Sequence, residues 1–252
     1  VALHVAEKIL TKEDRPYRVY TPYSRQWLQC RVEAPLSVPG SLVYPAQLPS
    51  DDNSAPWPDL SCWGLSASVA NLPSAGERAA RMRLKQALDS IVASYDERRD
   101  FPALAATSQL SQDLRFGSLS IRTVAHAVMQ WRAAAAERHR NGGLIFLKEL
   151  AWRDFYFAIL HHYPDVLNQE FDPQWRGLDW LQDHPGLEAW KFGMTGFPIV
   201  DAGMRELQAT GRMHNRVRMI VAMFLTKDLR VDWRIGEPVS YTHLRAHETE
   251  AD

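Results

Sequence analysis

The chain has 252 residues, 46% hydrophobic and 23% charged, so it can bury the core of one large domain or two small ones. Its formal net charge of -1 excludes long-range attraction of the whole molecule to phosphates, so a nucleic-acid site would need a local basic patch. The two cysteines, Cys30 and Cys62, cannot supply a zinc site by themselves and indicate reduced thiols, with a single disulfide as the alternative.

The sequence shows no sign of membrane insertion or export. No apolar run approaches the roughly 18 residues of a membrane-spanning helix, and no charged and then apolar leader opens the chain. These features predict a cytoplasmic protein. Because the first residue is Val1 and not Met, we expect the sequence to be part of a longer protein.

The chain changes character at Pro73. Residues 15–73 are dense in Pro and Ser without a helical period, which predicts a strand remnant followed by a long linker. After Pro73, Ser74 and Glu77 have the spacing of a capping box, and apolar residues follow at helical spacing as far as Tyr95. Further helices are predicted over residues 119–139, 143–162, 185–192, 198–210 and 214–229. No strand pattern follows Pro73, so this part should be all-α.

One face of the helix predicted over residues 143–162 combines a carboxylate, a cation and two aromatic rings. Glu149, Trp152, Arg153 and Tyr156 stand at positions i, i+3, i+4 and i+7. This pattern is typical of a salt-bridged surface with a half-buried Trp. The alternative is a pocket that stacks a flat ring on Trp152 and offers Glu149 as a hydrogen-bond acceptor.

The segment TGRMHNRVRMIVAMFLTKDL, residues 210–229, has the same kind of division. Polar and sulfur-containing residues share one helical face: Arg212, Asn215, Arg216 and Met219. The apolar residues should pack elsewhere: Val217, Ile220, Val221 and Phe224. A solvated helix end is the ordinary explanation, but arginines in a first turn oppose the helix dipole, which favours an anion nearby.

Other chemistries have little support in the sequence. His161 and His162 are adjacent and point apart on a helix, and no further ligand stands at metal spacing, so we expect no metal. The serine-hydrolase elbow, the phosphate-binding Walker loop and the dinucleotide-binding glycine motif are all missing. Thr107, Ser108 and Ser111 could hydrogen-bond a phosphate, although such residues are mainly helix caps.

Several long stretches together resemble one family. YDERRDFPALAATSQLS, LRFGSLSIR, KELAWRDFY and the run from WKFGMTGFPIVDAGM to LRVDWRIGE are similar, in order and spacing, to the helical flavin-binding domain of the DNA photolyase/cryptochrome family. RPYRVYTPYSRQW more weakly resembles the end of that family's N-terminal antenna domain. MHNRVRM is similar to the class I photolyases that act on cyclobutane pyrimidine dimers.

The resemblance implies a mainly α fold with a partial, all-helical FAD-binding domain. Residues 1–25 would be a remnant of the α/β antenna domain, residues 26–72 a Pro-rich interdomain linker, and residues 73–237 the FAD-binding domain, incomplete at its C-terminus. PVSYTHLRAHETEAD, residues 238–252, does not resemble the family's continuation, and we expect it to be a non-native tail. The Asp-x-Asp pair, Asn and Trp that close the family's flavin site have no counterpart here, which leaves open whether this chain is active.

The resemblance also implies roles for individual residues. The positions matching the cofactor site are Tyr95, Thr107, Ser108, Gln109, Leu110, Ser111, Phe146 and Asn215, of which Phe146 stands where the family often has Trp. The catalytic positions are Glu149, Trp152, Asn215 and Met219, which would line the pocket for a flipped dimer. The positions close to DNA are Trp152, Arg153, Tyr156, Asn215 and Arg216. Trp180 and Trp233 match the outer and middle members of an electron-transfer chain.

The function implied by the resemblance is light-dependent repair of cyclobutane pyrimidine dimers in DNA, by electron transfer from reduced FAD. The partner would be dimer-containing DNA, bound by a monomer without a metal or a membrane. An antenna chromophore of folate or deazaflavin type is implied for the parent protein only. A cryptochrome-type blue-light photoreceptor without repair activity, or an all-α module with vestigial sites, would be alternatives.

Overall fold

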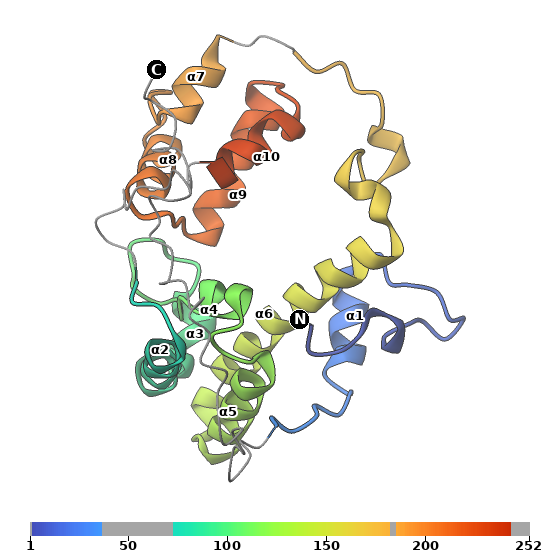
Figure 1. Cartoon of the computed structure of the whole chain (residues 1–252), viewed down its shortest axis with the longest axis vertical. Coiled ribbons are helices and arrows are strands. Elements are labelled where there is room, and N and C mark those ends of the chain that lie inside the picture. The colour runs from blue at the N-terminus through green and yellow to red at the C-terminus, as the bar shows by residue number, and fades with distance from the viewer. Residues whose placement is uncertain (1, 37–72, 182–184, 243–252) are drawn as a thin grey trace, which may run out of the picture. The chain divides into compact units, whose positions relative to one another are not determined.

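The computed structural model describes residues 2–36, 73–181 and 185–242 (Figure 1). These residues form helices and no strand; the β-type pairing among them is an isolated bridge between Leu10 and Pro16. The all-α fold expected after Pro73 is therefore confirmed for the part described. The chain divides into two compact units. Unit 1 contains residues up to 35 together with residues 74–178, and unit 2 contains the described residues from 179 onward.

Unit 1 is built around one long central helix. Its α-helices are α1 (Tyr20–Trp27), α2 (Glu77–Ser90), α3 (Tyr95–Arg98), α4 (Ser111–Phe116), α5 (Ile121–Ala134) and α6 (Arg140–His162). Short 3-10 turns lie at Ala6–Lys8, Val92–Ser94, Glu137–His139, Pro164–Leu167 and Pro173–Trp175. Helix α6 packs against α1, α3 and α5. Gly142 allows α6 to approach the 3-10 turn Val92–Ser94 closely, because a Cβ there would run into the carbonyl oxygen of Val92.

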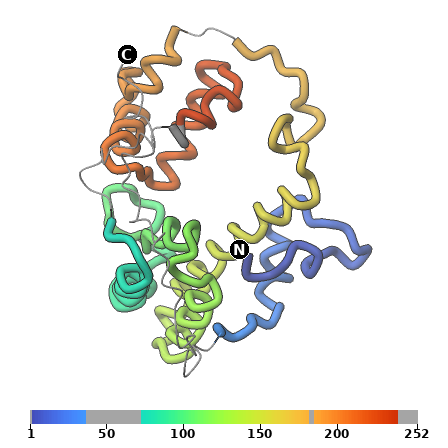
Figure 2. The backbone as a smooth tube through the Cα atoms, viewed as in Figure 1, coloured from blue at the N-terminus to red at the C-terminus, as the bar shows by residue number. Residues whose placement is uncertain are grey.

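The N-terminal segment is part of the core of unit 1. Asp154 of α6 is 1% exposed, and its carboxylate accepts hydrogen bonds from the backbone N–H groups of Leu3 and His4 and from Nε1 of Trp27. Figure 2 shows the blue N-terminal segment beside α6, drawn in yellow-green. Buried polar groups need such partners, so this carboxylate fixes segments more than 120 residues apart in the chain.

Unit 2 contains α7 (Gly186–Lys191), α8 (Pro198–Thr210), α9 (Asn215–Met223), a π-helical turn (Phe224–Asp228) and α10 (Trp233–Thr242). Trp190 of α7 is 2% exposed, and its Nε1 donates to the carbonyl oxygen of Val221 at 3.1 Å. Helices α8 and α9 pack closely at Gly203, where a Cβ would run into the side chain of Val217. The core of this unit thus forms around α7, α8 and α9.

Most of the expected helices form where the sequence predicted them. Helix α8 begins at Pro198 in the first helical position and is followed by Gly211 in the left-handed conformation, φ 66°. The segment predicted over 214–229 is α9 continued by the π-helical turn, and the segment predicted over 143–162 begins three residues earlier as α6.

Two local predictions are wrong. The capping box at Ser74 does not form: Gly76 precedes α2 with φ 92°, and the carbonyl oxygen of Ser74 instead accepts from Nη1 of Arg83. The expected strand remnant is helix α1 in the described part of residues 15–73. Tyr20, Tyr23 and Trp27 face α6 at helical spacing, and Pro22 is tolerated because it lies in the first turn.

The expected domain boundaries at residues 25, 72 and 237 stay a prediction. Helix α10 runs through Pro238 to Thr242, so the first residues of the expected non-native tail are helical. The remaining residues of that tail, 243–252, lie outside the described residues.

Candidate functional site

Helix α6 presents four of the predicted site residues on one face, which we call the α6 face: Glu149, Trp152, Arg153 and Tyr156. Tyr156 is 63% exposed, and the other three are half-buried. The neighbouring residues Leu147, Leu150 and Ala151 are buried in the core of unit 1. The helical spacing read from the sequence therefore separates a core side of α6 from a side that a ligand can reach.

Trp152 is surrounded by aromatic rings of its own chain. The ring of Tyr20 lies flat on it, with centroids 3.5 Å apart and planes at 7°. Tyr156 stacks at 5.6 Å and 23°, and Phe155 meets the indole edge-on at 5.7 Å. Tyr20 was not predicted as a site residue, although the spacing of Tyr20, Tyr23 and Trp27 is a signal for an apolar helix face. One face of Trp152 is thus already covered.

Glu149 is paired with a cation that the sequence analysis did not single out. Its Oε1 forms an ion pair with Nη1 of Arg99. The Nε atom of the same arginine lies 3.7 Å from Oδ1 of Asp100. The side chains of Arg99 and Glu149 are 24% and 33% exposed, so solvent screens the pair only in part. An ionised Glu149 can only accept hydrogen bonds, so a ligand on this face would have to donate one.

Tyr95 and Phe146 form a buried aromatic pair next to this carboxylate. Their ring centroids are 5.1 Å apart at 55°, and the two residues are 8% and 4% exposed. Burial raises the pKa of Tyr95 to about 12, and the charge of Glu149 adds to the rise while Arg99 opposes it. The phenol therefore stays protonated near neutral pH. Both residues were predicted for the cofactor site, and the structure brings them together.

Arg153 connects the α6 face with helix α4. Its Nη2 donates to the carbonyl oxygen of Leu114 at 3.4 Å, and its guanidinium carbon lies 4.6 Å from the ring centroid of Phe157. Burial lowers the pKa of Arg153, but an arginine remains charged under any physiological condition. The positive charge of Arg153 thus lies against α4.

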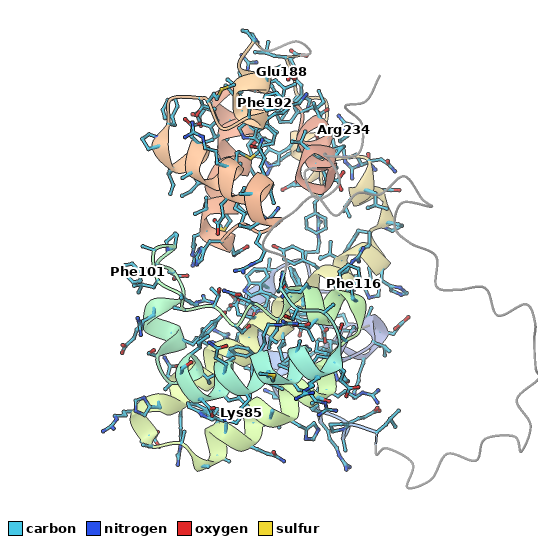
Figure 3. All side chains as sticks on the ribbon, turned by 60° about the vertical axis from the view of Figure 1, so that its left-hand side comes forward. Lys85, Phe101, Phe116, Glu188, Phe192 and Arg234 are labelled. Atoms are coloured by element: carbon cyan, nitrogen blue, oxygen red, sulfur yellow. The ribbon has the colours of Figure 1, made fainter. Side chains whose placement is uncertain are left out.

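Residues 107–111 form the turn that leads into α4. Thr107 and Ser108 are half-buried, Leu110 is 2% exposed, and Gln109 is exposed with φ 54°. This left-handed backbone costs about 1 kcal/mol for a residue with a Cβ. Phe101 and Phe116, which bracket the segment, are 58% and 84% exposed (Figure 3).

Two observations make this turn a candidate ligand site. In the described part of the chain, Nε2 of Gln112 is buried without a hydrogen-bond partner. Asp113 is 3% exposed, and both its oxygens accept from Arg83 at 2.8 and 2.6 Å. A buried donor without an acceptor is costly, so a bound group that supplies an acceptor would stabilise the site. The ion pair between Arg83 and Asp113 holds α4 against α2.

The predicted residues of unit 2 cluster at the beginning of α9. His214 precedes the helix, and its Nδ1 accepts from the backbone N–H of Arg216 at 3.2 Å. Asn215 is exposed, and Nη1 of Arg216 lies 3.8 Å from the sulfur of Met219, which is 46% exposed. The polar face predicted for this helix is therefore accessible from solvent.

The opposite side of α9 is less regular than predicted. Val217 and Val221 are buried, at 4% and 3% exposure, as the sequence indicated. Ile220 was expected to pack but is 37% exposed. Its position on the helix lies between the core side, where Val217 and Val221 meet α8, and the solvent side.

Trp180 and Trp233 come from two segments that pair within unit 2. The N–H of Leu181 donates to the carbonyl oxygen of Arg230 at 2.9 Å, and Nη2 of Arg230 reaches the carbonyl oxygen of Asp179 at 3.4 Å. Trp233 begins α10 three residues after Arg230, and both tryptophans are half-buried. The structure thus brings together the two segments predicted to carry electrons.

Among residues 2–36, 73–181 and 185–242, no group of three His, Cys, Asp or Glu side chains could hold a metal ion. No helix in these ranges is long and apolar enough to cross a membrane. Cys30 is a free thiol whose sulfur donates to the carbonyl oxygen of Gln26. Cys62 lies outside the described residues.

Comparison with known proteins places these features in a family. Residues 146–252, which include the α6 face, match the profile described as FAD binding domain of DNA photolyase. A deoxyribodipyrimidine photo-lyase of Halobacterium salinarum is 40% identical over 99% of this chain and 52% of its own length. The chain belongs to the DNA photolyase/cryptochrome family. It spans about half the length of the curated photolyases it matches.

Solved structures of photolyases have the same fold. The structure of a bacterial class III photolyase from Agrobacterium tumefaciens superposes with a TM-score of 0.84 and 38% identity, over 95% of this chain and 49% of that one. An archaeal photolyase from Sulfolobus tokodaii, described with two FAD molecules, gives a TM-score of 0.68 and 30% identity over 92% and 48%. The photolyase type of fold is confirmed, and the resemblance to class I stays a prediction.

Proposed function

We propose that this photolyase-family chain takes part in light-dependent repair of cyclobutane pyrimidine dimers in DNA, with reduced FAD as the electron donor. The observation that carries the proposal is the α6 face, where Trp152 and Glu149 lie one helical turn apart. An indole offers a stacking surface for a flat pyrimidine, and an ionised carboxylate beside it accepts the base's imide N–H. Its relatives named deoxyribodipyrimidine photo-lyase support the same substrate class.

The residues of unit 1 are suited to hold the cofactor. The buried donor Nε2 of Gln112 and the hydroxyls of Thr107, Ser108 and Ser111 would donate to phosphate oxygens. The buried Tyr95–Phe146 pair would provide an apolar wall. When bound, FAD supplies the absorption of light and the electron that opens the cyclobutane ring. Asn215, whose amide is exposed in unit 2, is a further cofactor candidate on the family resemblance alone.

The remaining candidates would act on the DNA and on charge transfer. Arg153 and Arg216 would contact DNA phosphates, and such contacts do not depend on the base sequence. Tyr156 and Met219 are exposed enough to pack on the extruded nucleotides. Trp180 and Trp233 would relay electrons between solvent and cofactor. The carboxylate of Glu149, paired with Arg99, would accept a hydrogen bond from the imide N–H of the neutral dimer.

The test is repair by the 252-residue chain itself. The chain is reconstituted with FAD, reduced without oxygen, and mixed with an oligonucleotide that contains one thymine dimer. Recovery of intact thymines is then measured under blue light and in the dark. Glu149→Gln should lower repair, because a neutral amide oxygen is a weaker hydrogen-bond acceptor than a carboxylate and forms no ion pair with Arg99. Glu137→Gln, in an exposed ion pair on another turn, is the matched control.

Three results would contradict different parts of the proposal. Stable FAD binding without loss of dimers would favour a photoreceptor of the cryptochrome type. Failure to bind both FAD and dimer-containing DNA would favour a module with vestigial sites. Equal repair by wild type and Glu149→Gln would show that Glu149 does not contribute.

A further inference from the structure

The contact between Tyr20 and Trp152 is unusual for an aromatic pair. The ring centroids are 3.5 Å apart and the planes are within 7° of parallel. Free aromatic pairs prefer offset or edge-to-face arrangements, with centroids about 4.5–7 Å apart. A flat, directly superposed contact therefore requires that the surrounding structure hold both rings in place.

Bonds on both sides of the stack provide this restraint. The hydroxyl of Tyr20 donates to the carbonyl oxygen of Lys148 at 2.6 Å, one turn before Trp152 on α6. Tyr20 is the first residue of α1, and at the other end of that helix Nε1 of Trp27 donates to Asp154 at 3.0 Å. Hydrogen bonds from α1 thus reach α6 at Lys148 and at Asp154, which lie on either side of Trp152 in the sequence. These bonds restrain Tyr20 from sliding along the indole.

The other contacts of Trp152 leave its ring few alternatives. Phe155 meets the indole edge-on at 5.7 Å, and Tyr20 contacts Phe155 in turn at 5.8 Å. A rotation of the indole about its side-chain bonds would have to displace both rings. A side chain held in its binding orientation before the ligand arrives loses less conformational entropy on binding.

We propose that Tyr20 is a positioning residue that fixes the ring plane of Trp152 for stacking on a pyrimidine dimer. This inference rests on the proposed function. Tyr20 acts through Trp152 and does not touch the reacting atoms. It comes from the segment expected to be a remnant of another domain, so a residue outside the helical FAD-binding segment would contribute to substrate binding.

The experiment measures how strongly the 252-residue chain prefers dimer-containing DNA to the same undamaged oligonucleotide, in the dark. The variants are Tyr20→Leu, which removes the ring, and Tyr20→Phe, which keeps the ring and loses the hydroxyl. Tyr17→Leu is the matched control: Tyr17 packs edge-on against Tyr23 in the same segment and lies outside the rings that contact Trp152. Trp152→Leu and the double variant Tyr20→Leu/Trp152→Leu complete a double-mutant cycle.

Tyr20→Leu should reduce the preference about tenfold, a value within the range measured for one base–aromatic stack. Tyr20→Phe should fall between wild type and Tyr20→Leu, because the ring remains but its bond to the carbonyl oxygen of Lys148, one of the two restraints, is lost. In the Trp152→Leu background, Tyr20→Leu should have no further effect, since the residue through which it acts is gone. A purely structural role would instead lower binding to both oligonucleotides in both backgrounds.

The outcomes separate the inference from the proposed function. A wild-type chain without preference for the dimer rejects the proposed function, and the inference with it. A wild-type preference that Tyr20→Leu and Tyr17→Leu reduce equally rejects the inference alone. If Tyr20→Leu does not fold, Tyr20→Phe and Tyr20→His decide: loss of the preference in both, despite a flat ring, contradicts positioning by stacking.

Discussion

Replacing Asp154 should release the N-terminal segment from α6. Its carboxylate is 1% exposed and accepts from three donors: the N–H groups of Leu3 and His4, each at 3.0 Å, and Nε1 of Trp27 at 3.0 Å. Asp154→Ala leaves all three donors buried without an acceptor. At about 1–3 kcal/mol for each unsatisfied group, reduced by partial relaxation, we expect a loss of about 4 kcal/mol in the free energy of unfolding.

Asp154→Asn should cost less, because the amide oxygen can stay opposite His4 and Trp27 while one acceptor becomes a donor. We expect about 2 kcal/mol for this variant. The assay is urea unfolding. Hydrogen exchange at the amides of Leu3 and His4 is measured as well, so that unit 1 is observed by itself. Glu7→Gln, in an exposed pair with His161, is the control and should cost less than about 0.5 kcal/mol. If Asp154→Ala destabilises by less than 1 kcal/mol with both amides still protected, the reasoning is refuted.

Three further predictions concern interactions within unit 1 or within unit 2. Burial favours the neutral form of Asp201, but hydrogen bonds from a hydroxyl and two backbone amides hold the pKa of its carboxyl below the usual value. The stabilisation of unit 2 by this carboxylate should therefore be present above about pH 4 and be lost as the pH falls through the folded pKa. A stability–pH profile that Asp201→Asn leaves unchanged would contradict this. Gly203→Ala should destabilise unit 2 by about 1–3 kcal/mol in urea unfolding, because the new Cβ meets Val217; a neutral effect would show that α8 and α9 can move apart. Arg83→Met should cost about 3 kcal/mol by leaving Asp113 buried and unpaired, and a double variant with Asp113→Leu should recover much of it in the same assay.

Sequence reasoning located the elements that carry their own local signals. Helix α8 has Pro198 at its start and Gly211 after its end, and both signals are independent of the rest of the fold. Helix α1 lacked such signals, because Pro22 and the polar residues around it look like a loop in a single sequence. Its stability comes from packing on α6, which periodicity cannot reveal.

The candidate site divides in the same way. The α6 face was visible because Glu149, Trp152 and Tyr156 lie on one helix, and their relation depends only on helical geometry. Tyr20 and Arg99 were missed because they reach that face from other segments, 132 and 50 positions away from their partners Trp152 and Glu149. Family resemblance supplied candidate roles, while the contacts that hold those residues could be known only from the structure.

The attachment of residues 2–35 to α6 has a consequence for anyone who divides this protein into pieces. A fragment that starts at Pro73 would expose the side of α6 that covers Tyr23 and Trp27, each 2% exposed, and would leave Asp154 without its donors. The unit that keeps the α6 face is therefore discontinuous in sequence, and two separately expressed peptides could reassemble it.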